Sequence, residues 1–321
     1  MQKASLPLLL LAVDAANPIV PGVGMADPHM HVWPAQPDKV YVYATHDCNR
    51  AGDASQPCAA AAGELGFLME DWWVWSSTDL VAWTQEARVY PTALAYENAN
   101  TTDECWATDA ASLADGTTFF YLSVGPRSIG VVAGPTPAGP FADPLGAPLV
   151  AEGDYPTYAR DPGVLLDDDG AAYLIFGTFS YFVARLGADM ISLAETARGV
   201  QVRDLQHADD KPFLHKRNGV YYLSWGCFYA LGASPYGPFN YSGSIIDPAR
   251  LANTSFADGG GTSDRHGSFF ELHGQTYFAC NDQSHGGSGG FRSSIIAYAH
   301  YRENGSIATL RIDETLSLIH I

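Results

Sequence analysis

The chain has 321 residues, of which 47% are hydrophobic and 16% are charged, a balance that suits a packed globular core. Its formal net charge of −18 at pH 7 argues against nucleic acid and anionic membranes as partners, because phosphate binding requires clustered Lys and Arg. A neutral substrate fits this charge better. No linker or charge block divides the chain, so we expect one domain.

The N-terminal residues 1–16 resemble a secretory signal peptide. Lys3 precedes a short apolar stretch, residues 6–13, and the small residues Ala15 and Ala16 follow it. The alternative is a truncated or mis-started N-terminus. Asn-x-Ser/Thr sequons, which are compatible with secretion, occur at Asn100, Asn240, Asn253 and Asn304. We therefore expect a secreted or extracellular protein with its domain over residues 17–313 and a C-terminal tail over residues 314–321.

A short pattern recurs five times: a polar residue, a strand-like run, a turn and an aromatic-rich strand. The leading residues are Asp27, Asp109, Asp161, Asp210 and His266, separated by 82, 52, 49 and 56 positions. These spacings are close to the length of a four-stranded propeller blade. In four copies the turn contains a residue suited to positive φ, namely Asp115-Gly116, Asp169-Gly170, Asn218-Gly219 and His273-Gly274. Each copy therefore predicts one β-hairpin.

Long helical periodicity is absent, and the repeat predicts an all-β fold, a single-domain five-bladed β-propeller. The first strand of every blade runs beside the central axis, so the five leading residues are expected to converge at one end of it. For any one Asp the alternative is ordinary turn chemistry.

The five cysteines show neither Cys-x-x-Cys spacing nor a zinc signature. Cys48 and Cys58 flank a loop and could form a local disulfide in an oxidising compartment. Cys227 and Cys280 lie in apolar strand contexts and are expected to be small buried side chains.

Motifs along most of the chain resemble glycoside hydrolase family 43. They include Ala26-Asp27-Pro28, Ser77-Thr78-Asp79-Leu80, Cys105-Trp106-Ala107, Asp161-Pro162-Gly163 and Gly267-Ser268-Phe269-Phe270. The resemblance implies a five-bladed propeller that cleaves arabinosyl or xylosyl linkages with inversion. It also implies that Asp27 is the general base and that Asp161 orients the general acid and raises its pKa.

The fourth copy departs from the family pattern, in which a Glu that precedes Gly-Pro is the general acid. This chain has Asp210-Lys211-Pro212, so by register Asp210 takes the place of the acid. Asp is one methylene shorter than Glu, and the neighbouring Lys211 favours the ionised carboxylate. Three explanations stay open: Asp210 is the acid, another acid supplies the proton, or catalysis has been lost. The other candidate acids are Asp209, Glu97 and Glu104.

The resemblance further implies that His266 reaches a cation, commonly calcium, on the axis. The alternative is a satisfied polar core histidine. Trp106 and Arg292 are expected to contact the sugar, with blade packing and a surface salt bridge as the respective alternatives, and Trp33 is a candidate for the pocket or its rim. We expect no organic cofactor.

Together these features predict a monomeric, inverting exo-glycosidase that acts on an oligo- or polysaccharide, with α-L-arabinofuranosidase favoured over β-xylosidase on resemblance alone. The rival hypothesis is a carbohydrate-binding propeller that lost the general acid, and a third is an enzyme for fructosides or galactosides.

Overall fold

The computed structural model describes residues 13–47, 69–97, 104–246, 265, 267–282, 291–312 and 315–318. Within these ranges the regular structure is β-strand, apart from one short 3₁₀-helix, η1 (Pro91–Ala93). The all-β prediction is confirmed. No helix in the described part is long and apolar enough to cross a membrane.

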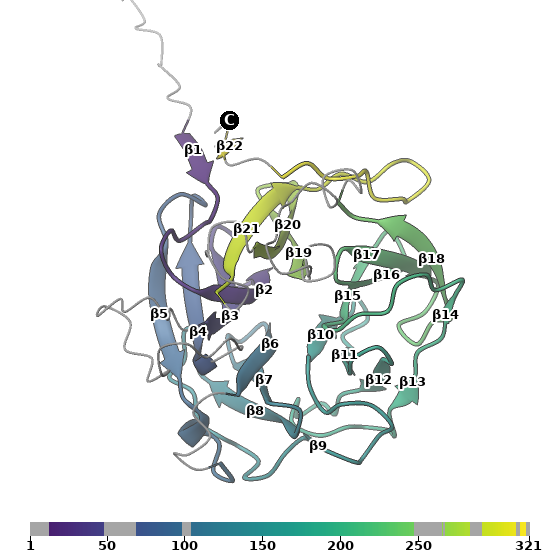
Figure 1. Ribbon diagram of the computed structural model, residues 1–321. Helices are drawn as coiled ribbons and strands as arrows, with labels where there is room; N and C mark the ends of the chain where they lie inside the picture. Colours follow the sequence, from purple (N-terminus) through teal and green to yellow (C-terminus); the bar gives the residue numbers. More distant parts are fainter. Residues whose placement is uncertain are drawn as a thin grey trace, which may run out of the picture.

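Five antiparallel sheets surround a central axis and form the predicted five-bladed propeller (Figure 1). Blade 1 contains β2 (Met25–Val32), β3 (Val40–Asp47), β4 (Met69–Ser77) and β5 (Thr84–Val89). Blade 2 contains β6 (Cys105–Ser112), β7 (Thr118–Val124), β8 (Ser128–Gly134) and β9 (Val150–Ala151). Blade 3 contains β10 (Gly163–Leu166), β11 (Ala172–Phe176), β12 (Phe182–Arg185) and β13 (Arg198–Gly199).

The last two blades differ from this pattern. Blade 4 consists of β15 (Phe213–Arg217), β16 (Val220–Trp225), β17 (Phe228–Gly232) and β18 (Phe239–Ser244), with β14 (Val202–Arg203) added parallel to β18. Blade 5 has three described strands, β19 (Gly267–Leu272), β20 (Gln275–Asp282) and β21 (Ser293–Tyr298).

The predicted turns join the first two strands of blades 2 to 5. Gly116 and Gly170 have φ of +91° and +81°, a backbone conformation that glycine adopts without the steric cost of a Cβ. The pairs Asn218-Gly219 and His273-Gly274 have positive φ at both residues, as type I′ hairpin turns require. The local turn chemistry therefore sets the hairpin positions.

The first strands β2, β6, β10, β15 and β19 form a closed inner ring in which each contacts the next, and β19 contacts β2 (Figure 1). Apolar side chains pack between neighbouring blades. Tyr43 of blade 1 and Phe120 of blade 2 belong to one buried cluster, and Phe213 of blade 4 and Phe269 of blade 5 belong to another. Cys227 and Cys280 are buried as predicted, and burial raises the pKa of each thiol to about 12.

A segment from the start of the chain completes blade 5. The Asn17 side chain donates to the Ile296 carbonyl oxygen at 2.8 Å and accepts from the Ile296 amide at 2.9 Å. Two residues later, the Ile19 amide donates to the Ser294 carbonyl oxygen at 3.0 Å. These bonds cover the edge of β21, which the three described strands of blade 5 leave without a neighbour.

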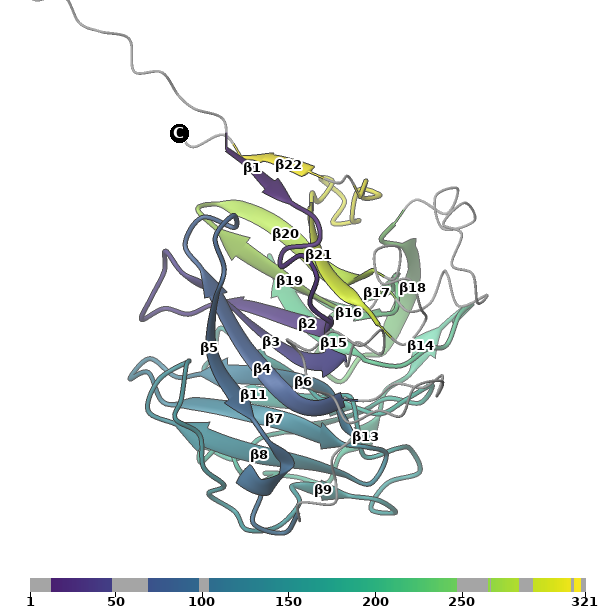
Figure 2. The same cartoon turned by 60° about the vertical axis from the view of Figure 1, so that its left-hand side comes forward.

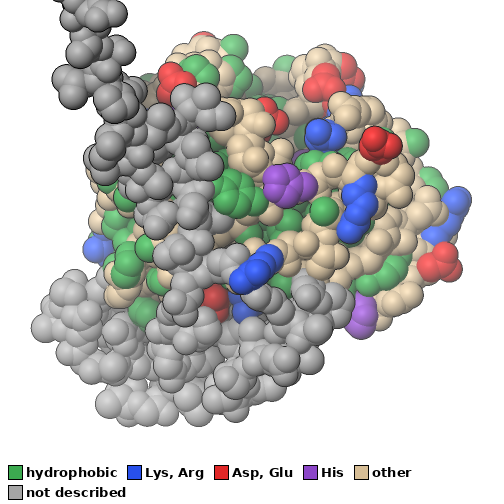
Figure 3. Space-filling view, turned by 90° about the horizontal axis from the view of Figure 1, so that it is seen from above, with side chains coloured by type: hydrophobic (Ala, Val, Ile, Leu, Met, Phe, Trp, Pro, Cys, Tyr) green, Lys and Arg blue, Asp and Glu red, His purple; other side chains and the backbone are tan. Residues whose placement is uncertain are grey.

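Strand β1 (Val13–Ala16) pairs antiparallel with β22 (Thr315–Leu318) beyond blade 5 (Figure 2). These strands lie in the segments expected to be a signal peptide and a C-terminal tail. The view onto this side of the molecule shows acidic and basic side chains interspersed on the described surface (Figure 3).

Candidate active site

One layer of side chains at the axis comes from residues that share a backbone conformation. Asp27, Asp161 and Lys211 have φ of +52°, +59° and +52°, and a proline follows each of them. Asp27 lies within the first strand of its blade, whereas Asp161 and Lys211 lie just before theirs. Positive φ is uncommon for residues other than glycine. The three residues are therefore equivalent in blades 1, 3 and 4, and their side chains enter the axis at the same level.

This equivalence corrects the predicted ring in blade 4. Lys211, and not Asp210, stands in register with Asp27 and Asp161. Asp210 occupies the preceding position, which corresponds to Ala26 and Arg160 in the other two blades. The proline is the reliable marker of the register, because it follows the positive-φ residue in all three blades.

Asp27 is buried, with 2% of its surface exposed, and its carboxylate accepts hydrogen bonds from three directions. Asn281 Nδ2 donates to Oδ1 at 3.0 Å, Arg292 Nη1 donates to the same oxygen at 3.1 Å, and Thr45 Oγ1 donates to Oδ2 at 3.3 Å. The Asp27 amide also donates to Asn281 Oδ1 at 2.6 Å. A carboxylate held as an acceptor by a guanidinium and an amide suits a general base.

Arg292 is itself fixed by a second buried acid. Its Nε and Nη2 donate to the two carboxylate oxygens of Asp47, each at 2.9 Å, and its backbone amide donates to Asp47 Oδ2 at 2.8 Å. Burial raises the pKa of Asp47, and the charge of Arg292 opposes this shift. Arg292, predicted to contact the sugar, thus uses its guanidinium to hold Asp47 and Asp27.

Asp161 lies across the axis on blade 3. Its Oδ2 accepts from Thr178 Oγ1 and from the Lys211 amide, both at 3.2 Å, and its own amide donates to Ser123 Oγ at 2.9 Å. Arg160 Nε lies 3.6 Å from the same Oδ2. Since the Lys211 amide binds Asp161, the backbone of the preceding residue, Asp210, lies near this carboxylate.

The candidate acids differ in their surroundings. The Asp210 amide donates to Asp209 Oδ1 at 2.9 Å, so the two carboxylates occupy one turn. Both acids are near Tyr181. Burial is the main cause that raises the pKa of Tyr181, and the negative charges of Asp209, Asp210 and Asp161 raise it further. The other two candidates, Glu97 and Glu104, lie 3.7 Å and 2.7 Å from Arg127 Nη2. Of the four, Asp209 and Asp210 directly precede Lys211, whose amide binds Asp161.

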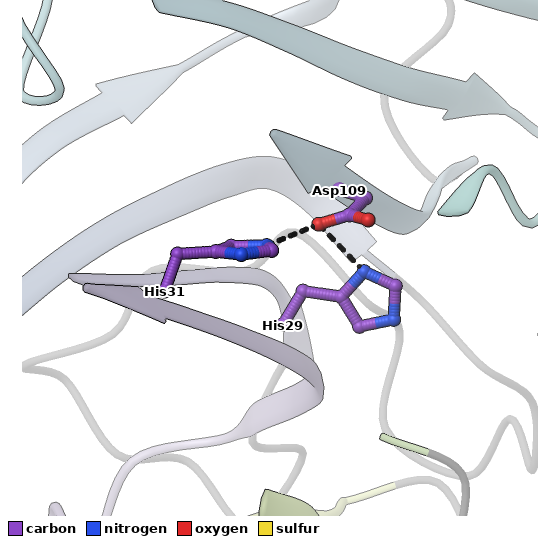
Figure 4. Close-up of side chains that lie close together, drawn as sticks. All are labelled: His29, His31 and Asp109. Carbon is purple, nitrogen blue, oxygen red and sulfur yellow. Dashed lines mark hydrogen bonds and ion pairs between the residues drawn. The ribbon is translucent and has the colours of Figure 1, made fainter. Parts of the chain in front are cut away.

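Asp109 lies deeper along the axis than predicted. A bulge at Ala107 shifts the pairing of β6 with β7, so Asp109 is level with Val164, whose amide donates to Asp109 Oδ2 at 2.6 Å. Its Oδ1 lies 2.8 Å from His29 Nδ1 and 2.6 Å from His31 Nε2 (Figure 4). Asp109 therefore pairs with two histidines of β2, beneath the layer of Asp27 and Asp161.

The His29, His31 and Asp109 group is the one cluster in the described residues with metal-ligand spacing. Calcium, the cation expected on the axis, takes six to eight oxygen ligands. This cluster offers two imidazoles and one carboxylate, whose other oxygen already accepts from Val164. The positive charge of Lys211 also acts on His29. This cluster therefore does not fit a calcium ion, and His266 lies outside the described residues.

The buried histidine His29 makes stability dependent on pH. Burial lowers its pKa from 6.5 to about 4, the charge of Asp109 opposes this, and that of Lys211 adds to it. The unfolded chain takes up this proton below about pH 6.5 and the folded chain does not, so the free energy of unfolding falls as the pH drops from about 6.5 to 4, by on the order of 3 kcal/mol for this residue. His215, with a pKa lowered to about 3, acts in the same direction.

We expect urea unfolding at several pH values to show this fall, and His29→Asn to make it shallower. His300 offers a matched control, since His300→Asn removes an imidazole that is exposed on the surface. An equal slope in the parent and His29→Asn would contradict the assignment.

The predicted aromatic contacts separate into two groups. Trp106 lies next to the layer formed by Asp27, Asp161 and Lys211, which we call the catalytic layer. The Arg160 guanidinium stacks over the Trp106 ring at 5.1 Å and also lies beside Asp161. Trp33 follows the end of β2, six residues from Asp27, which at about 3.3 Å per residue is roughly 20 Å away. It is buried, and its ring stacks on His31 at 4.5 Å. This position is one of core packing.

A groove of about 430 Å³ opens beside Asp161 on blade 3. It includes Thr178, whose hydroxyl binds Asp161, and the exposed aromatic residue Tyr158. Phe179, the most exposed large apolar side chain in the described residues at 57%, follows Thr178 directly. Aromatic rings next to a polar groove suit the apolar faces and hydroxyl groups of a sugar.

Sequence reasoning missed Lys211, Asn281 and Asp47 as parts of this site. Lys211 had a detectable signal, since it precedes Pro212 as Asp27 precedes Pro28. Asn281 and Asp47 had none, because they reach Asp27 or Arg292 only through contacts between distant strands.

Comparison with known proteins agrees with this geometry. Residues 15–307 match the model of glycosyl hydrolases family 43. The chain belongs to glycoside hydrolase family 43. The match spans Asp27, Asp161 and Asp210 and the inner strands next to them, and it confirms the predicted family and the assignment to the glycoside hydrolases.

Among the relatives of this family 43 chain is an arabinoxylan arabinofuranohydrolase of Paenibacillus polymyxa, 28% identical over 94% of this chain and 54% of the relative. The chain thus spans about half the length of that protein. A β-D-galactofuranosidase of Aspergillus niger is 32% identical over 82% of this chain and 75% of its own length.

The fold matches solved family 43 structures over most of the chain. A β-xylosidase/α-arabinofuranosidase from a compost metagenome, in complex with xylotriose and in a calcium-free form, has a TM-score of 0.72 and 26% identity, covering 93% of this chain and 98% of that one. A Xanthomonas citri enzyme complexed with xylotriose also has a TM-score of 0.72, with 27% identity and 93% coverage of both chains.

Proposed function

We propose that this chain is an inverting exo-glycosidase that removes terminal furanosyl or pentosyl residues, with α-L-arabinofuranosides as the preferred substrates. The observation that carries the proposal is the asymmetry of the catalytic layer. Asp27 is held as a hydrogen-bond acceptor on blade 1, and across the axis Asp161 accepts from the amide of Lys211, the residue that follows Asp210. One acceptor facing one candidate donor is the arrangement that single displacement by water needs.

In this mechanism Asp27 takes a proton from a water molecule as the water attacks the anomeric carbon. The glycosidic bond breaks, and Asp210 donates its proton to the leaving oxygen. Asp161 acts through Asp210, because its negative charge favours the protonated form of a neighbouring acid. Inverting enzymes hold the two carboxyl groups roughly 6.5–9.5 Å apart so that water fits between the base and the sugar.

The relatives support this choice of substrate. One is named for arabinoxylan and another for β-D-galactofuranosides, and both names specify a furanosyl group. In this proposal the groove lined by Tyr158 and Thr178, with the exposed Phe179 next to Thr178 in the chain, gives the remainder of a polysaccharide a surface beside Asp161. In this proposal Trp106, over whose ring the Arg160 guanidinium stacks, lines the sugar pocket.

The test is a panel of 4-nitrophenyl glycosides, with α-L-arabinofuranoside, β-D-xylopyranoside and β-D-galactofuranoside compared by kcat/KM. The arabinofuranoside should be the best substrate, and proton NMR of the first product should show the inverted anomer. A first product of retained configuration would refute the mechanism, and preference for either other glycoside would refute the substrate assignment.

A second candidate function is carbohydrate binding without hydrolysis. The observation that favours it is the shorter acid side chain at Asp210, next to the buried cation Lys211. Binding of arabinoxylan oligosaccharides without turnover of any member of the panel would support this function and refute the enzyme.

A further inference from the structure

The Lys211 side chain crosses the propeller axis. Blade 4 has blades 3 and 5 as its neighbours, because β15 contacts β10 and β19. Lys211 Nζ nevertheless donates to the Asp27 carbonyl oxygen in blade 1 and to the Thr108 carbonyl oxygen in blade 2, each at 3.1 Å. The side chain therefore spans the channel and ties three blades together.

The residue is buried, with 1% of its surface exposed. Burying an ammonium group is costly unless opposite charges and hydrogen bonds compensate for lost hydration. Burial lowers the pKa of Lys211, and three carboxylates oppose that shift: Asp27, Asp161 and Asp109 in that order. The same three carboxylates would repel one another without a cation among them. The Lys211 ammonium thus compensates the negative charge of these three carboxylates.

The other charged groups around Asp27 come from several elements. Arg292 reaches it from the segment before β21, Asp47 lies behind Arg292 on β3, and Asp161 enters from blade 3. On the deeper side are His29 of β2 and Asp109 of β6. Among these described groups, Lys211 and Arg292 are the two that carry a fixed positive charge next to Asp27.

We propose that the Lys211 ammonium is the resident cation of the axis, which fixes the Asp27 backbone and keeps the Asp27 carboxylate ionised, so that hydrolysis by this chain requires no bound metal ion. Lys211 is a positioning residue, because its ammonium contacts backbone carbonyl groups and not the sugar. The catalytic part of this inference rests on the proposed function. Its basis is the geometry of Lys211 together with the poor fit of the His29, His31 and Asp109 cluster to calcium.

The first experiment uses the parent protein. Dialysis against excess EDTA, and later addition of Ca²⁺, should leave both kcat/KM for the best panel substrate and the melting temperature unchanged. A loss on chelation that Ca²⁺ restores would overturn the proposal. The melting temperature can be measured whether or not the parent protein hydrolyses a substrate. A parent protein without activity would refute the proposed function, and its melting temperature with and without EDTA would still show whether the axis holds a metal ion.

The second experiment compares Lys211→Met with Lys216→Met, which removes a lysine charge from the same blade. Lys216 is partly exposed and pairs with Asp167 at 2.5 Å, away from the catalytic layer. Loss of a cation beside a carboxylate raises its pKa, so the acid limb of the kcat/KM profile should move up by about one pH unit in Lys211→Met. The acid limb should stay in place in Lys216→Met.

A uniform loss of activity with the acid limb unmoved would show a purely structural Lys211 and overturn the inference. Circular dichroism checks folding. If Lys211→Met does not fold, Lys211→Gln keeps a donor for the backbone carbonyls without the charge and is measured in its place. The parent chelation result stands without any variant.

Discussion

Asp27→Asn is expected to lower kcat by about a thousandfold, within the range by which a positioned general base accelerates a reaction. The amide cannot accept the proton of the attacking water. It keeps the shape of the carboxylate, and its oxygen can still accept from Asn281 and Arg292. The Thr45 hydroxyl can turn to accept from the new amide. Folding and sugar binding should therefore stay close to those of the parent.

The measurement is kcat on the aryl glycosides of the panel, with calorimetric binding of an oligosaccharide to confirm an intact pocket. Asp38→Asn is the matched control, because Asp38 is an exposed acid at the β2–β3 turn, with 85% of its side chain accessible. Activity in Asp27→Asn near that of the parent would place the base elsewhere.

Asp210→Ala is expected to nearly abolish hydrolysis of natural glycosides while sparing substrates with good leaving groups. A dinitrophenolate leaves without protonation, whereas a sugar alkoxide does not. The ratio of kcat/KM for the two substrate types should therefore change by about a hundredfold or more, in line with the usual contribution of general-acid catalysis. Asp210→Glu restores the missing methylene and should retain or raise activity.

Asp209→Ala is the control for this experiment. Asp209 is adjacent, and its Oδ1 accepts from the Asp210 amide, so its removal perturbs the same turn without removing the proposed proton donor. Hydrolysis of natural glycosides by Asp210→Ala at the parent rate would rule out Asp210. A leaving-group effect in Asp209→Ala would transfer the role of acid to Asp209.

The architecture was readable from the sequence because local chemistry determines it. Positive-φ pairs such as Asn218-Gly219 set the hairpins, and their spacing set the number of blades. The place of Asp27 and Asp161 at the axis was predictable for the same reason, since each precedes a proline in a repeated motif. The depth of Asp109 was not readable, because it depends on a bulge at Ala107 that changes the pairing register. A single extra residue in one strand leaves no mark on the spacing of motifs.

Contacts between distant residues were equally hidden. Arg292 was assigned to the sugar from its position in a motif, yet its guanidinium binds Asp47 and Asp27, which lie 245 and 265 positions away in the sequence. Trp33 looked like a rim residue, but the length of β2 carries it away from Asp27. The contacts of Arg292 and the position of Trp33 depend on how the blades are arranged around the axis. The residue pattern along one strand contains no information about that arrangement.

The bonds from Asn17 and Ile19 to β21 have a consequence for the order in which the enzyme matures. Asn17 and Ile19 are synthesised before all five blades, and they find their partners only after Ser294 and Ile296 have been made. Blade 5 also supplies Asn281, and the segment leading into β21 supplies Arg292, both of which hold Asp27. A nascent chain that stops after blade 4 therefore contains Asp27 but neither of these two hydrogen-bond donors. The same step that closes the ring thus completes the hydrogen bonding of the Asp27 carboxylate.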